Sequence, residues 1–164
     1  MVQTKEDPEE LHKICDVLDR LTLDALSLMQ EEIDLKITAE NSMMVGETHL
    51  AKTRYICGQN SVSSLQLPCE NSPEFEALTT VNFASDQGVM QFDMEVHKPN
   101  NENYVEPLKW FGFMPPQNLQ FAQNLYRQAV QWIVQAANVQ VRLAETYKQI
   151  SQLKVLKKEA VAKG

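Results

Sequence analysis

The side chains able to act as acids, bases, nucleophiles or metal ligands are few and scattered in this sequence of 164 residues. The three histidines, His12, His49 and His97, fall in three different segments. His12 and Cys15 share one helix face if that segment is helical, but two ligands are too few for a structural or catalytic zinc site. We therefore interpret His12 as a surface histidine and Cys15 as a buried thiol. The sequence predicts no catalytic residue, no metal and no cofactor.

Motifs and composition exclude several classes of function. No phosphate loop, dinucleotide fingerprint, nucleophile elbow or zinc spacing occurs, so we expect no enzyme. The net charge of -7 argues against nucleic acid as a partner, because phosphate binding depends on clustered Lys and Arg. Three cysteines and no Asn-X-Ser/Thr acceptor fit the cytosol. We expect no signal peptide and no membrane span, so that any membrane association depends on a partner.

The segment 118–156 has the strongest helical pattern, and we predict a helix over 117–160. Its apolar positions recur in steps of three and four, which is typical of a helix that lies along another helix. This predicted seam consists of Leu119, Ala122, Tyr126, Ala129, Ile133, Ala136, Gln140, Leu143, Tyr147 and Ile150.

The apolar stripe of this helix is wider than one seam. It is widened by Leu125, Trp132 and Val139 on one side and by Val130 on the other. Either these residues pack on the rest of the chain, or a partner protein supplies a third helix. On the second interpretation, the partner-binding residues are Leu125, Val130, Trp132, Ile133, Val139 and Leu143, together with Trp110 and Phe111.

A first helix is predicted over 8–57. Asp7 can cap it, Pro8 fits its first turn, and Gly58 fits its end. Beyond Leu28 the apolar residues Met29, Ile33, Ile37 and Met44 shift the phase, which predicts local unwinding, and Gly46 is a candidate kink. The predicted seam residues before this shift are Leu11, Ile14, Leu18, Leu21, Ala25 and Leu28.

Charge predicts how the two helices lie together. Residues 1–46 carry eleven acidic and four basic side chains, whereas residues 142–164 carry six basic and two acidic ones. An antiparallel hairpin places the acidic start beside the basic end, and exposed pairs of this kind favour an orientation although each adds little stability. The alternative is that both runs are independently solvated.

The connection over 58–116 is predicted to be irregular, with a small β-hairpin over 75–97. Apolar and polar residues alternate from Phe75 to Phe83 and from Met90 to Val96, with a loop over 84–88 between them. The predicted fold class is mainly α: a long antiparallel two-helix coiled-coil hairpin, with the β-hairpin in its long connection. We expect one domain over 1–164.

Residues 106–116 combine four large apolar side chains with flanking prolines, which keep the segment from forming regular helix. Such a segment is either a plug that packs on the helices or an exposed docking patch.

Two segments resemble a known family. The first is AKTRY at 51–55, followed by Gly58, Ser61-Val62 and Leu65-Gln66, and the second is EPLKWFG at 106–112, followed by Leu119 and Ala122-Gln123. They are similar to motifs of the coiled-coil assembly factors of the vacuolar proton-translocating ATPase, the coiled-coil domain-containing protein 115 family. The family usually has Ala where Thr53 stands and often has Asp where Glu106 stands.

The resemblance implies a non-catalytic assembly chaperone for the membrane sector of this pump. It implies an integral membrane assembly factor of the endoplasmic reticulum as partner and subunits of the membrane sector as clients. The implied location is the cytosolic face of the endoplasmic reticulum, with the ER–Golgi intermediate compartment, endosome and lysosome as further compartments. The implied consequence is acidification of lysosomes and endosomes. The alternative is a prefoldin-like cytosolic chaperone subunit, which shares the order helix, β-hairpin, helix.

Overall fold

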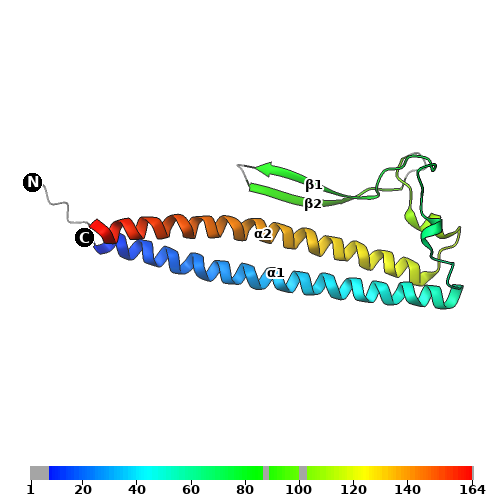
Figure 1. The fold of residues 1–164 in the computed structure, drawn as a ribbon, viewed down its shortest axis with the longest axis horizontal. Coiled ribbons are helices and arrows are strands. Elements are labelled where there is room, and N and C mark those ends of the chain that lie inside the picture. The colour runs from blue at the N-terminus through cyan, green and yellow to red at the C-terminus, as the bar shows by residue number, and fades with distance from the viewer. Residues whose placement is uncertain (1–7, 87–88, 100–102, 164) are drawn as a thin grey trace, which may run out of the picture. The chain divides into compact units, whose positions relative to one another are not determined.

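The computed structural model describes residues 8–86, 89–99 and 103–163. Two long helices, α1 (Pro8–Cys57) and α2 (Gln117–Lys163), pack side by side in opposite directions (Figure 1). A small antiparallel pair of strands lies between them in the chain. The predicted fold class, a mainly α antiparallel helical hairpin with a β-hairpin in its connection, is confirmed. The predicted cap Asp7 lies outside the described residues.

The chain forms two compact units, and both helices run through each of them. Unit 1 consists of Met1–Asp34 and Ala137–Gly164, and unit 2 of Leu35–Ala136. The core of unit 1 is apolar and is formed by both helices: Leu18, Ala25 and Ile150 are buried, and Ile14, Leu21, Leu143 and Leu153 pack against them. Burial of such side chains contributes about 1.5–3 kcal/mol each, so this cluster holds the two helices of unit 1 together.

Helix α1 keeps one regular heptad seam, contrary to the predicted phase shift. From Leu18 onwards its least exposed positions follow each other in alternating steps of three and four. Met29, Ile33, Ile37 and Met44 are exposed instead. The pattern of apolar residues predicted the wrong positions because small and polar residues occupy the second half of the seam. The whole seam consists of Leu18, Leu21, Ala25, Leu28, Glu32, Leu35, Ala39, Ser42, Gly46, His49 and Thr53.

Helix α2 departs from the predicted seam beyond Ala129. One step of three directly follows another, so Trp132 and Val139 are less exposed than Ile133 and Gln140. Such an irregular step moves the buried line by one residue. Tyr147 is exposed for the same reason, although its hydroxyl lies 3.2 Å from the sulfur of Met29. The buried line beyond Ala129 is Trp132, Ala136, Val139, Leu143, Thr146, Ile150 and Leu153.

Gly46 is not a kink, because α1 is continuous through it. It is buried against α2, where a Cβ atom would lie 3.3 Å from the Tyr126 ring and 3.6 Å from Leu125 Cβ. The glycine therefore permits a close approach of the two helices. Gly58, with φ 96°, follows the last residue of α1 in the left-handed conformation that glycine adopts without strain.

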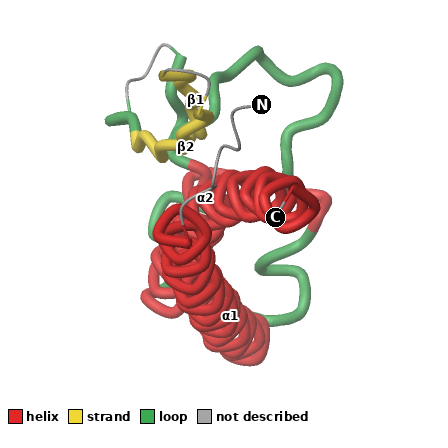
Figure 2. The backbone as a smooth tube through the Cα atoms, turned by 90° about the vertical axis from the view of Figure 1, so that its left-hand side faces the viewer, coloured by secondary structure: helices red, strands yellow, loops and turns green. Residues whose placement is uncertain are grey.

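The connection contains two short 3-10 helices and the strands β1 (Thr79–Asp86) and β2 (Val89–Val96). Figure 2 draws the rest of its described residues as loop. The strands pair from Thr79 with Val96 to Asp86 with Val89, so Ala84, Ser85 and Asp86 belong to the strand and not to the predicted loop. The 3-10 helices are η1 (Ser64–Gln66), which has a capping box from Ser63, and η2 (Pro107–Phe111).

Candidate protein interaction surface

The second 3-10 helix is held to α2 by one carboxylate. Glu106, at the start of η2, accepts a hydrogen bond from Gln123 Nε2, and its other oxygen lies 3.6 Å from Arg127 Nη2. Gln123 and Arg127 are four residues apart on α2 and therefore share one face. All three side chains are partly buried, which strengthens their interaction relative to a surface pair. We call these three residues the clamp.

The clamp places Trp110 against the base of the β-hairpin. The Trp110 ring meets Phe75 edge-on, with centroids 5.1 Å apart. Trp110 and Phe111 are half-buried, whereas Phe113 is 100% exposed and Met114 is also exposed. The segment is therefore a plug as far as Phe111 and an exposed patch beyond it. The space around Trp110 has a volume of about 400 Å³ and is lined in part by Phe75, Leu78, Val105, Tyr126 and Val130.

Removing the clamp carboxylate is expected to release η2. Glu106→Ala leaves Gln123 and Arg127 without their acceptor, and the loss of such partly buried bonds costs about 1–3 kcal/mol. The emission of Trp110, recorded in a Trp132→Phe background because the chain has two tryptophans, should shift to the red. Glu74→Ala, an exposed change in the same connection, is the control. Unchanged emission in the Glu106 variant would contradict the clamp.

An apolar groove lies between the helices of unit 2. Its apolar members Met43, Met44 and Ile133 are exposed, and its volume is about 480 Å³. Charged side chains border it on α1. Its full lining is Lys36, Ala39, Glu40, Met43, Met44, Glu47 and Ile133. We call this set the outer groove. An apolar strip with a charged margin is the arrangement that receives an amphipathic helix.

The proposed partner-binding residues differ in their access to solvent. Ile133 is 51% exposed and lines the outer groove, and Val130 is also exposed. Leu125 and Trp132 are half-buried, and Leu143 packs in the core of unit 1. Val139 is only 4% exposed, so it is not available to a partner in this conformation. Among the predicted seam residues, Leu18, Leu28, Leu119 and Ile150 are buried, and Leu11, Ile14, Leu21 and Tyr126 are half-buried.

Tyr126 and His49 tie α1 to the start of α2 in unit 2. Burial raises the pKa of Tyr126, and the negative charge of Glu47 raises it further, so its phenol stays protonated at neutral pH. His49 Nδ1 lies 3.0 Å from Asn118 Oδ1, and its ring packs on Phe121 with centroids 5.5 Å apart.

The residues considered for chemistry remain dispersed. His12 Nε2 lies 3.8 Å from Asp16 on an exposed helix face, and Cys15 is half-buried. Cys57 and Cys69 are exposed, and a hydrogen bond with the Ser72 hydroxyl lowers the pKa of Cys69. Within residues 8–86, 89–99 and 103–163, no three His, Cys, Asp or Glu side chains converge in a way that would hold a metal.

Comparison with known proteins finds relatives along most of the chain. No family model matches it. The vacuolar ATPase assembly protein VMA22 of Danio rerio is 25% identical over 82% of this chain and 87% of the relative. The human VMA22 is 28% identical over 77% of this chain and 83% of the relative. The Bos taurus VMA22 is 25% identical over 75% of this chain and 82% of the relative.

The chain is a distant homologue of VMA22. The predicted resemblance to vacuolar ATPase assembly factors is confirmed as a distant relationship over most of the chain, whereas the assignment to the coiled-coil domain-containing protein 115 family stays a prediction. The VMA22 relatives are named as vacuolar ATPase assembly proteins. No helix in the described part of the chain is both long and apolar enough to cross a membrane.

Proposed function

We propose that this chain is a non-catalytic assembly factor for the membrane sector of the vacuolar-type proton ATPase. It acts at the cytosolic face of the endoplasmic reticulum, with an integral membrane assembly factor as partner and subunits of the membrane sector as clients. Its loss impairs acidification of lysosomes and endosomes. The observation that carries the proposal is homology to VMA22 proteins along 75–82% of the chain.

The outer groove supports a mechanism of recruitment. Exposed apolar side chains on two packed helices favour association with a further helix, because burying them removes apolar surface from water. Met43 and Met44 on α1 and Ile133 on α2 provide such a surface in unit 2. We propose that a helical segment of the membrane partner docks there, with Val130 and Trp132 at its margin. We also propose that Trp110 and Phe111 contribute to this docking by holding the plug beside α2.

Ile133→Asp is expected to abolish co-purification of the membrane partner from detergent-solubilised membranes. The substitution places a charge in the apolar groove, where burial without a counter-charge costs several kcal/mol. The fold should persist, because Ile133 is half exposed in the free protein. Gln131→Asp adds the same charge at an exposed position of the same helix and should leave co-purification intact.

The same variants should also differ in their ability to support assembly of the ATPase in cells. In cells that lack their own copy, the parent chain and Gln131→Asp should restore lysosomal acidification, measured with a ratiometric dye, whereas Ile133→Asp should not. Full rescue by a folded Ile133→Asp would contradict docking in the outer groove. Failure of the parent chain to rescue, or to recover any ATPase membrane-sector subunit, would contradict the assembly function itself. Leu143→Asp is a poor test, because Leu143 packs in the core of unit 1.

A prefoldin-like cytosolic chaperone subunit is the second candidate. The order helix, β-hairpin, helix supports it. Native mass spectrometry discriminates between the two, because a six-subunit particle is expected for a prefoldin-like protein and a complex with one membrane protein for the assembly factor.

A further inference from the structure

The β-hairpin has one apolar and one polar face. Successive side chains of a strand point to opposite faces, and the register places partners of β1 and β2 on the same face. One face carries Thr80 and Asn82 of β1 with Asp93 and Glu95 of β2. The other face is mostly apolar. Beside Thr79 and Ser85 at its ends, its members are Val81, Phe83, Met90, Phe92, Met94 and Val96.

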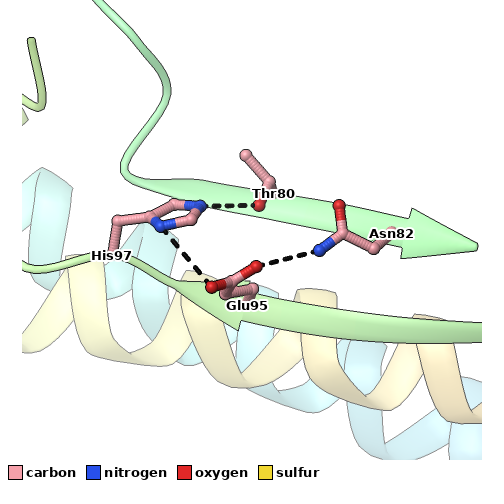
Figure 3. A network of polar contacts seen from close by, with 4 residues as sticks. All are labelled: Thr80, Asn82, Glu95 and His97. Atoms are coloured by element: carbon pink, nitrogen blue, oxygen red, sulfur yellow. Dashed lines mark hydrogen bonds and ion pairs between the residues drawn. The ribbon is translucent and has the colours of Figure 1, made fainter.

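The polar face is organised by a chain of contacts (Figure 3). The His97 ring lies 3.0 Å from the Thr80 hydroxyl and 3.7 Å from Glu95, whose other oxygen accepts a 2.9 Å hydrogen bond from Asn82. The His97 ring also stacks on Tyr104, with centroids 4.4 Å apart. These contacts fix the register of the two strands, so the hairpin presents its apolar face in a defined arrangement.

The apolar face is partly exposed, and Phe92 and Met94 are half-buried. Phe83 is 71% exposed, and Val81, Met90 and Val96 are exposed as well. An isolated two-stranded hairpin is marginally stable in water, and stability requires a further strand or a packing partner. The exposed aromatic and aliphatic side chains therefore make this hairpin a site for association.

At alternate residues of both strands, the backbone amide and carbonyl groups point away from the other strand. The bond from the His97 amide to the Leu78 carbonyl identifies the hydrogen-bonded pairs of the ladder as 78/97, 80/95 and 82/93. The alternate pairs, such as Val81 with Met94, direct their amide and carbonyl groups outward. The sheet built from the described residues has two strands, so each is an edge strand. The residues with outward backbone groups are those of the mostly apolar face.

Charge distinguishes the two edges. On β1, the one charged residue is Asp86 at the end of the strand, whereas β2 carries Asp93 and Glu95 within its length. Two copies that paired through β2 would bring these carboxylates together, and the chain as a whole has a net charge of -7. A basic strand would instead gain opposite-charge neighbours across the new ladder. Acidic residues on the polar face thus favour a basic partner over a second copy.

We propose that β2 accepts, as a third strand, an extended segment of another polypeptide in which apolar residues alternate with Lys or Arg. The apolar residues of this segment extend the apolar face, and its basic residues lie beside Asp93 and Glu95. Main-chain bonds to the outward groups of Met90 and Met94 supply affinity, and the alternate side chains supply specificity. This surface lies on the β-hairpin, so the proposal stands independently of docking in the outer groove and of the ATPase function.

A capped synthetic peptide in which Val and Lys alternate is the probe, and its matched peptide has Glu in place of each Lys. The full chain should bind the basic peptide, followed by fluorescence anisotropy, and should bind the acidic peptide at least about tenfold more weakly. Amide hydrogen exchange should slow at Met90 and Met94 on binding the basic peptide. Equal affinity for both peptides would overturn the proposal.

Proline at outward positions tests which edge is used. Met94→Pro removes an outward donor of β2 and should weaken binding about tenfold or more, because that bond is lost and the ring obstructs pairing. Val81→Pro is the matched control: Val81 is the ladder partner of Met94, and the change removes the corresponding donor of β1. Loss of binding in the Val81 variant with retention in the Met94 variant would overturn the assignment to β2.

Asp93→Lys tests the charge without altering the ladder. This variant should abolish most of the preference for the basic peptide, because the new lysine lies beside the remaining carboxylate of Glu95. Slow amide exchange at Thr80 and Glu95, which belong to a hydrogen-bonded pair, shows that the hairpin of each variant is intact. An unchanged preference in an intact Asp93→Lys hairpin would overturn the proposal. So would a free protein that forms a dimer through β2, seen as a halved mass in Met94→Pro.

Discussion

Ile150→Asp should be the most destabilising single substitution in unit 1. Ile150 is 6% exposed and forms the buried core there with Leu18 and Ala25. A carboxylate at this position lacks a partner in an apolar environment, and such a change costs about 3–5 kcal/mol. Because unit 1 contains both the first part of α1 and the last part of α2, both should lose protection in amide hydrogen exchange.

Val155→Asp provides the comparison for that result. Val155 lies on the same helix five residues further on and is exposed, so its replacement should change the free energy of unfolding by no more than about 0.5 kcal/mol. If the two variants lost equal stability, the core assigned to unit 1 would be wrong. Urea unfolding followed by circular dichroism measures both.

Gly46→Leu should destabilise unit 2 although it improves helix propensity. Leucine gains roughly 1 kcal/mol over glycine in a helix interior. The gain is outweighed because the Cβ atom alone would lie 3.3 Å from the Tyr126 ring, and the rest of the side chain would have to displace that ring or separate the helices. Overpacking of this kind costs about 1–3 kcal/mol, and displacement of Tyr126 adds to it.

A short series at Gly46 isolates the steric cause. Gly46→Ala should be close to neutral, since its propensity gain opposes a mild contact, whereas Gly46→Leu should lower the urea midpoint. Ala51→Leu, an exposed change on the same helix, should have little effect on that midpoint. A Gly46→Leu protein as stable as the parent would show that the helices do not approach closely at this position.

The helical hairpin was predictable because the signals for its helices come from residues that are close together in the sequence. Apolar residues recur in steps of three and four along each helix. A proline lies in the first turn of α1, and a glycine follows its end. The strand alternation is local in the same way, and it located β1 and β2. Their ends were less well predicted, because the pairing of Ala84 with Gln91 depends on the register of the whole ladder.

The phase of the seam was not predictable by hydrophobicity alone. Glu32 belongs to the seam of α1, and its carboxylate accepts a 2.6 Å hydrogen bond from Gln140. Ser42 and Thr53 occupy further seam positions, and Thr53 is fully buried with its hydroxyl bonded to the His49 carbonyl. The more hydrophobic Ile33 and Ile37 remain outside. The positions between the helices are therefore occupied by side chains of suitable size or with a polar partner. A count of apolar residues cannot identify such positions.

The candidate surface was only partly visible in the sequence. Ile133 was singled out, but its neighbours Met43 and Met44 come from the other helix and approach it only through folding. Gln123 and Glu106 belong to the second motif, yet their mutual contact and the role of Arg127 depend on a turn of the chain before α2. The spacing of Gln123 and Arg127 by four residues was the signal that indicated a shared face.

The composition of the helix seam has a consequence for the lifetime of the protein in the cell. Alanine supplies five of the twelve buried apolar residues in the described part of the chain, and one alanine methyl group contributes only about 0.8 kcal/mol on burial. A core with so many alanine residues gives the chain a small free energy of unfolding. Mass action then makes the abundance of the chain depend on whatever binds its native form, so that unassembled copies are degraded while complexed ones persist.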